Sequence, residues 1–158
     1  MDSITQAALG AAVGEAMLGR KLGNRALLWG MLFGTVPDLD VILSPLLDTA
    51  YNLVWHRGPS HSLLIMIIAS FALAPWLAKL WKKNKVSKGL AGAFVFAAWS
   101  THVLLDCFTV YGTSVLWPFS ETRIAFNNLF IIDPLYTLPL IVTLVWLSFL
   151  RTKKTLPK

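Results

Sequence analysis

Apolar residues are grouped into five segments long enough to form helices, separated by shorter polar stretches. Such runs predict helices that are buried in a protein core or in a membrane. Prolines set several of the boundaries, because the residue before a proline disfavours the helical conformation. The predicted helices cover residues 3–19, 25–36, 61–81, 88–106 and 134–150. The pattern therefore predicts an all-α bundle of about five helices.

The lengths of these segments indicate which of them can cross a bilayer. Residues 61–81 and 88–106 approach the ~20 residues that span the hydrocarbon core, whereas residues 25–36 reach only about half of its ~30 Å. Hydrophobic residues make up 56% of the chain, and the mean hydropathy is +0.62. We expect one membrane-embedded domain over residues 1–150 and a basic tail over residues 151–158. Gly10 and Gly14 are expected to allow close helix packing.

The basic residues are expected to lie on one side of the membrane. If the helices alternate in direction, twelve of the 14 Lys and Arg residues fall at one end, and only Arg57 and Arg123 fall at the other. Basic residues concentrate on the cytoplasmic side of membrane proteins. We therefore expect a multi-pass protein with a cytoplasmic C-terminus, whose partner is the bilayer and not a nucleic acid. All three His residues and seven of the eight acidic residues map to the extracytoplasmic end, where ionisable groups at membrane depth indicate function.

Two pairs of residues have a spacing that suits metal binding. His102 and Asp106 are four residues apart, so on a helix they project from one face and could bind one ion. Asp38 and Asp40 would point the same way in an extended segment and could converge on a metal. The alternatives are an intrahelical hydrogen bond for the first pair and a helix cap for either aspartate. Mixed nitrogen and oxygen ligands suit zinc, with manganese or iron as harder alternatives.

The stretch HRGPSHS, residues 56–62, precedes the longest apolar run. We expect Ser60 to cap the following helix, which would place His61 in the first turn as a neutral metal ligand. The turn between the histidines could fold His56 over the site as a second ligand or a proton shuttle. The guanidinium of Arg57 could bind a phosphate or carboxylate. Anchoring at the membrane interface is the alternative for His56 and Arg57.

Asp133 stands directly before Pro134, which is a signature of a helix N-terminus. A capping acid can also turn an oxygen toward a metal or toward a ligating histidine. We therefore predict one or two divalent ions and six candidate ligands. These are Asp38, Asp40, His61, His102, Asp106 and Asp133.

Five ordered blocks of sequence resemble the YdjM-type family of inner-membrane metal-dependent hydrolases. The blocks are MDSITQAALGAAVGEA, GTVPDLD, HRGPSHSLL, HVLLDCFTVYGTSVLWPFS and FIIDPLYTLPL. This family is similar to the superfamily of zinc-dependent phospholipase C and single-strand nucleases, whose sites include a His-x-x-x-Asp pair that His102 and Asp106 match. Many relatives carry Thr-His near the N-terminus, where this chain has Thr5 and Gln6, and an amide is a poor substitute for an imidazole ligand.

The residues and the resemblance together predict a metal-dependent hydrolase in a bacterial-type inner membrane. We expect it to act on a phosphoester of a lipid or lipid-linked substrate at the outer face. The metal would lower the pKa of a bound water, Arg57 and Arg123 would hold the anionic substrate, and Asp40 would accept a proton. The alternatives are a metalloprotein whose ion is structural, a regulatory protein that acts through a partner, and a transporter.

Overall fold

The computed structural model describes residues 1–46 and 57–155, and within them five α-helices are the main elements. These helices are α1 (Ser3–Leu22), α2 (Arg25–Thr35), α4 (Leu63–Leu80), α5 (Lys88–Cys107) and α6 (Pro134–Thr155). Between them lie the 3-10 helices η1 (Val36–Leu46), η2 (Pro59–His61) and η3 (Lys82–Asn84). The predicted all-α fold of about five helices is confirmed.

Side-chain caps explain where most of the helices begin. The carboxylate of Asp2 accepts a hydrogen bond from the amide of Thr5 at the start of α1, and the hydroxyl of Ser87 accepts one from Leu90 at the start of α5. At the start of α4 the cap is Ser62, which accepts from the amide of Ile65 at 3.2 Å. The prediction that Ser60 caps this helix was wrong, and His61 lies before the helix in η2.

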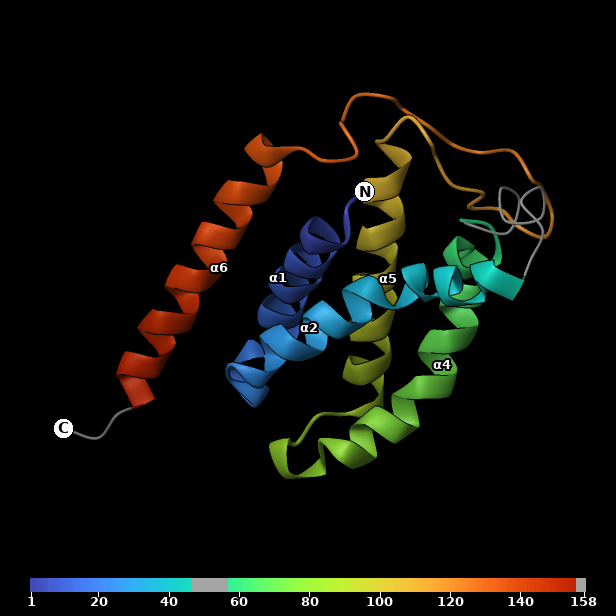
Figure 1. Cartoon of the computed structure of the whole chain (residues 1–158). Helices are drawn as coiled ribbons and strands as arrows, with labels where there is room; N and C mark the ends of the chain where they lie inside the picture. The colour runs from blue at the N-terminus through green and yellow to red at the C-terminus, as the bar shows by residue number, and fades with distance from the viewer. Residues whose placement is uncertain (47–56, 156–158) are drawn as a thin grey trace.

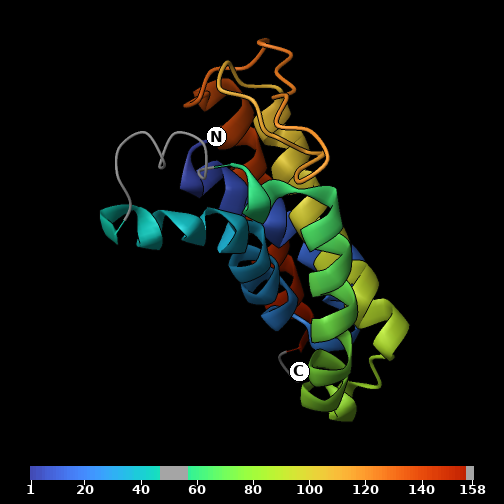
Figure 2. The same cartoon turned by 90° about the vertical axis from the view of Figure 1, so that its right-hand side faces the viewer.

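The helix α5 lies at the centre of the bundle (Figure 1). It packs against α4 and also contacts α1 and α2, while α1 and α2 form a tightly packed hairpin. The view in Figure 2 shows α4 in front of α5. The helix α6 stands to one side, where it contacts α1.

Glycines bring the backbones of α1 and α2 into direct contact. A Cβ atom added to Gly10 would lie 2.2 Å from the carbonyl oxygen of Gly30, and one added to Gly34 would lie 2.7 Å from that of Gln6. Both distances are too short for any side chain. The predicted close packing at Gly10 and Gly14 is therefore confirmed, and it depends equally on two glycines of α2.

Two of the helices, α4 and α5, are long and apolar enough to cross a membrane, judged by length and composition. A shorter apolar stretch covers residues 134–150 of α6. Large apolar side chains are exposed on the outside of the bundle, including Phe71 on α4 (79%) and Leu135 on α6 (89%). Such exposure suits contact with lipid.

The connection between α5 and α6 covers one end of the bundle without forming a helix (Figure 1). Two isolated β-bridges join it to itself, at Thr109 with Leu129 and at Thr113 with Ile124. It also fixes the segment before α4, because the amide of Ser114 donates to the carbonyl oxygen of Arg57 at 3.1 Å. The connection thus holds residues 57–63 against the end of α5.

Candidate metal centre

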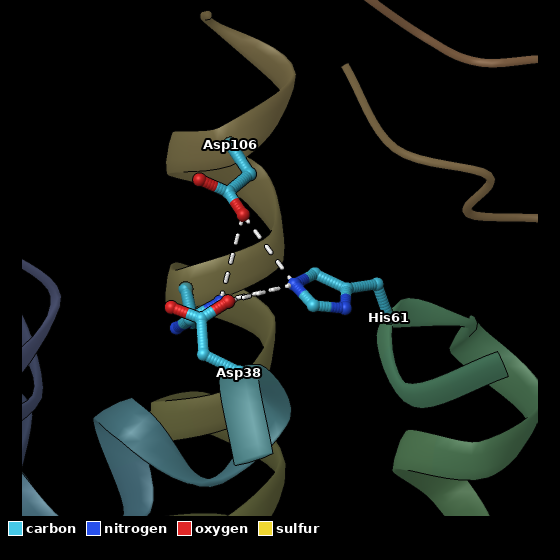
Figure 3. A group of neighbouring side chains, drawn as sticks. Asp38, His61 and Asp106 are labelled. Carbon is cyan, nitrogen blue, oxygen red and sulfur yellow. Dashed lines mark hydrogen bonds and ion pairs between the residues drawn. The ribbon is translucent and has the colours of Figure 1, made fainter. Parts of the chain in front are cut away.

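Four side chains from three elements meet at this end of the bundle. Asp38 comes from η1, His61 from η2, and His102 and Asp106 from α5. One ligand atom of each lies within 4.8 Å of the other three, and Figure 3 shows Asp38, His61 and Asp106 pointing toward one centre. His61, His102 and Asp106 are at most 1% exposed. The group could therefore hold a metal ion.

The separations between these atoms match the edges of a small coordination shell. The Nε2 atoms of His61 and His102 are 3.1 Å apart. Nε2 of His61 lies 3.4 Å from Oδ2 of Asp106 and 3.6 Å from Oδ1 of Asp38, and Nε2 of His102 lies 3.6 and 3.4 Å from the same two oxygens. Ligands about 2.0–2.1 Å from a tetrahedral ion are about 3.3 Å from each other. The four residues therefore fit a divalent ion.

Hydrogen bonds behind the two rings indicate which nitrogen of each ring faces the centre of the cluster. Nδ1 of His102 lies 2.6 Å from the carbonyl oxygen of Gly34, so it must be the protonated nitrogen. Nδ1 of His61 lies 2.9 Å from the hydroxyl of Ser60, which itself donates to Oδ2 of Asp40 at 2.8 Å and so accepts from the ring. Both Nε2 lone pairs then face the centre, where only a cation can bring them together.

The two aspartates point to the same conclusion. Oδ1 of Asp38 and Oδ2 of Asp106 are buried and have no hydrogen-bond donor within the part of the chain that the structure describes. A buried carboxylate oxygen without a donor costs about 1–3 kcal/mol or more. These are the same oxygens that face the two histidines. A cation in the centre would satisfy both of them.

The electrostatics of the cluster favour positive charge. Burial alone would raise the pKa of Asp38, but in the metal-free protein a second proton on the rings of His102 and His61 lets them donate to this carboxylate and holds its pKa well below its usual range. Burial alone would lower the pKa of His61, but the protonated ring could donate to Asp106 and Asp38, and together with the negative charges of these carboxylates this raises the pKa. Protons and metal ions therefore compete for this centre.

Gln6 and Arg57 hold the Asp106 carboxylate in place from outside the cluster. The amide of Gln6 donates to Oδ1 at 3.0 Å and to the carbonyl oxygen of His102 at 3.3 Å. The amino group of Met1 also contacts Oδ1, and Nε of Arg57 lies 3.3 Å from Oδ2. Gln6, expected from the sequence to be only a poor replacement for histidine, thus orients the candidate ligand Asp106 and hydrogen-bonds to the backbone of the candidate ligand His102.

Comparison with known proteins shows the family to which the chain belongs. The profile of the YdjM inner membrane protein family matches residues 1–156. The chain belongs to this family. It is similar to the inner membrane protein YbcI of Escherichia coli (strain K12), with 33% identity over 125 residues that cover 76% of this chain and 69% of YbcI. No solved structure matches the chain.

In this YdjM family member Arg57 lies beside the cluster in a constrained position. It is 6% exposed, and its backbone has a φ of 63°, a left-handed conformation that is uncommon for residues other than glycine. Its Nη1 donates to Thr109 at 3.3 Å, and its Cζ lies 5.1 Å from the centre of the Tyr111 ring. Cζ of Arg123 lies 4.4 Å from the same ring. The two predicted substrate-binding arginines thus meet at Tyr111, a residue that no pattern in the sequence indicates.

Two other predicted ligands, Asp40 and Asp133, lie outside the group of four. Asp40 lies behind His61, where it accepts hydrogen bonds from Ser60 and from the amide of Arg57. The expected extended segment was wrong: Asp38 and Asp40 both lie in a 3-10 helix, where residues two apart point to different sides. Asp133 caps α6, accepting from the amide of Leu135 at 3.1 Å. His56 lies outside the described residues.

Proposed function

We propose that the protein is a membrane-bound metal-dependent hydrolase that acts on a phosphoester of a lipid or lipid-linked substrate. The observation that carries the proposal is the buried set of two imidazole nitrogens and two carboxylate oxygens next to a buried guanidinium. This donor set suits zinc, with manganese or iron as alternatives. Asp38, His61, His102 and Asp106 are the proposed ligands.

Each neighbouring residue has a separate role in this proposal. A bound divalent ion would lower the pKa of a water molecule and polarise the scissile ester. Arg57 is held by its hydrogen bond to Thr109 and offers its guanidinium to the anionic group of the substrate. Arg123 adds a second positive charge on the ring of Tyr111, which both arginines contact. Oδ2 of Asp40 accepts hydrogen bonds from Ser60 and from the Arg57 amide, so we assign Asp40 to orienting His61 in place of accepting a proton.

We further propose that the site faces the outer side of the inner membrane and that the C-terminus is cytoplasmic. The membership of an inner-membrane family and the apolar helices α4 and α5 support the location. The concentration of lysine and arginine at the end of the bundle away from the cluster supports the orientation. A site at the opposite end of the bundle, where the cluster lies, would meet the phosphate of a lipid at the surface of the bilayer.

One observation favours a second candidate, in which the ion only ties η1, η2 and α5 together. Four protein ligands fill a tetrahedral shell, as in structural zinc sites, whereas catalytic sites keep one position open. An ion that accepts five or six ligands would leave positions open around the same four residues. Turnover therefore separates the two candidates.

The experiment that tests the hydrolase is an activity screen of purified, metal-loaded protein on phospholipids and other lipid phosphoesters. We expect metal-dependent release of a phosphorylated product. Arg57→Ala should keep the metal and lower kcat/KM, and Arg57→Lys should recover only part of the loss, because an ammonium keeps the charge without the bidentate geometry. Lys83→Ala, at the other end of the bundle, is the control. Metal-loaded protein that turns over no phosphoester would favour the structural ion.

A further inference from the structure

A surface groove between α4 and α5 lies away from the metal cluster. Its volume is about 590 Å³, and its walls are almost entirely apolar. Phe71 and Pro75 of α4 line one wall, and Gly92 and Phe96 of α5 line the other. Lys88, the first residue of α5, also lines the groove. The groove therefore combines the surface of a hydrocarbon site with a positive charge at one end.

Two glycines of α5 explain the shape of this groove. A Cβ atom at Gly92 would lie 3.2 Å from Cβ of Ala74, so the two helices are close together at that level. A Cβ atom at Gly89 would have no neighbouring heavy atom within 4 Å. The helices are therefore packed at Gly92 and leave open space beside Gly89, next to Lys88.

The region around Lys88 is rich in lysine and has no acidic residue nearby in the sequence. Five lysines fall within residues 79–88, and residues 63–105 contain no Asp or Glu. The turn that carries them is attached to α1, because Nζ of Lys21 donates to the carbonyl oxygen of Lys85 at 2.8 Å and Nδ2 of Asn84 donates to that of Lys21 at 2.9 Å. A ligand that matches this end of the groove carries net negative charge.

We propose that the groove binds an anionic phospholipid, with an acyl chain along the apolar walls and the phosphate at Lys88. The groove lies between the two helices that are long and apolar enough to cross a membrane, so its open side faces hydrocarbon. Basic pockets between such helices near the membrane surface bind anionic head groups. Zwitterionic lipids carry a cationic group that the neighbouring lysines repel. This site is independent of the proposed hydrolase, since it lies at the opposite end of α5 from Asp106.

Native mass spectrometry of the full chain in detergent tests the proposal directly. Phosphatidylglycerol and phosphatidylcholine with identical acyl chains are titrated against the protein, and retained lipid is counted. We expect phosphatidylglycerol to be retained about fivefold more strongly for each lysine that reaches its head group. Lys88→Gln should lower this preference about fivefold, whereas Lys79→Gln removes the same charge outside the groove and should preserve it.

A second variant tests the apolar part of the site. Gly89→Leu places a side chain in open space without disturbing the packing of α4 on α5, so it should reduce lipid retention, whereas Ala72→Leu on the exposed surface of α4 should not. Equal retention of the two lipids by the unmodified protein would overturn the proposal. So would an unchanged lipid preference in Lys88→Gln together with unchanged lipid retention in Gly89→Leu, or a dimer that Gly89→Leu dissociates while lipid is never retained. Metal content, measured on the same samples, should not change in any variant.

Discussion

At the scale of single residues, the groups behind the two histidines decide what the cluster can bind. The carbonyl oxygen of Gly34 and the hydroxyl of Ser60 each occupy the Nδ1 side of a ring, which leaves both Nε2 atoms as acceptors. Together with the two aspartate oxygens, these atoms form a buried centre with acceptors alone. A cation at the centre would stabilise these acceptors, and Nε of Arg57 already lies 3.3 Å from one of them, Oδ2 of Asp106.

Ser60→Ala tests this arrangement without removing a ligand. The hydroxyl that fixes the ring of His61 would be lost, and outer hydrogen bonds of this kind contribute about 10–100-fold to metal affinity. We expect zinc affinity, measured by competition with a chelator, to decrease by about 10–100-fold. Ser87→Ala, which removes the cap of α5, should lower thermal stability and leave zinc affinity unchanged. Equal affinities for Ser60→Ala and the unmodified protein would show that Ser60 does not hold the ligand.

At the scale of elements, the packing of α2 on α1 positions part of the centre. Gly34 lies against the backbone of Gln6 and Gly10, and its carbonyl oxygen accepts the hydrogen bond from His102. The same glycine thus supports a helix contact and the orientation of a candidate ligand. A change at this position should affect stability and metal binding together.

Gly34→Ala should therefore separate α1 from α2 and disturb His102. The added methyl group would lie 2.7 Å from the carbonyl oxygen of Gln6, and overpacking of this kind costs about 1–3 kcal/mol. We expect a lower midpoint in thermal unfolding and weaker zinc binding in the same sample. Gly89→Ala is the control, because the space there is open and alanine favours a helix by about 0.5–1 kcal/mol. A lower unfolding midpoint with unchanged zinc affinity in Gly34→Ala would contradict the link between helix packing and metal binding.

The helices could be predicted from sequence because their signals are local. Prolines, capping residues and apolar runs lie within the elements they define, as at Pro134 and Ser87. The 3-10 helix η1 lacks such a signal, and assuming an extended segment gave Asp38 and Asp40 the same direction when they have different ones. His102 and Asp106 were paired correctly because the helix that carries both of them was predicted correctly.

The rest of the site depends on contacts between distant parts of the chain. Gln6 reaches Asp106 across 100 residues, and Gly34 reaches His102 across 68. No local pattern in a single sequence indicates that residues so far apart along the chain are in contact. The groove beside Lys88 likewise depends on how α4 meets α5.

At the scale of the whole molecule, the protein has two chemically different ends. The candidate metal centre and two arginines lie at one end, and the lysine-rich turn around η3 lies at the other (Figure 1). The apolar helices between them suit a bilayer. This separation predicts that the two ends face different compartments.

Labelling of single cysteines in intact cells tests that orientation. Asn128 and Lys83 are exposed at opposite ends, and the native Cys107 is buried and should stay unlabelled. We expect an impermeant reagent to label Asn128→Cys directly and Lys83→Cys only after the cytoplasm is opened, because basic residues stay on the cytoplasmic side. The reverse pattern would place the metal centre in the cytoplasm.

The most direct test of the central claim is the metal content of purified protein, measured by mass spectrometry of the elements. We predict about one divalent ion per chain and its loss in His102→Ala, because the remaining groups cannot replace the missing ligand. Asp133→Asn, which alters the cap of α6 outside the cluster, should retain the ion. Protein that holds no ion after incubation with zinc, or His102→Ala that holds as much as the unmodified chain, would contradict the assignment.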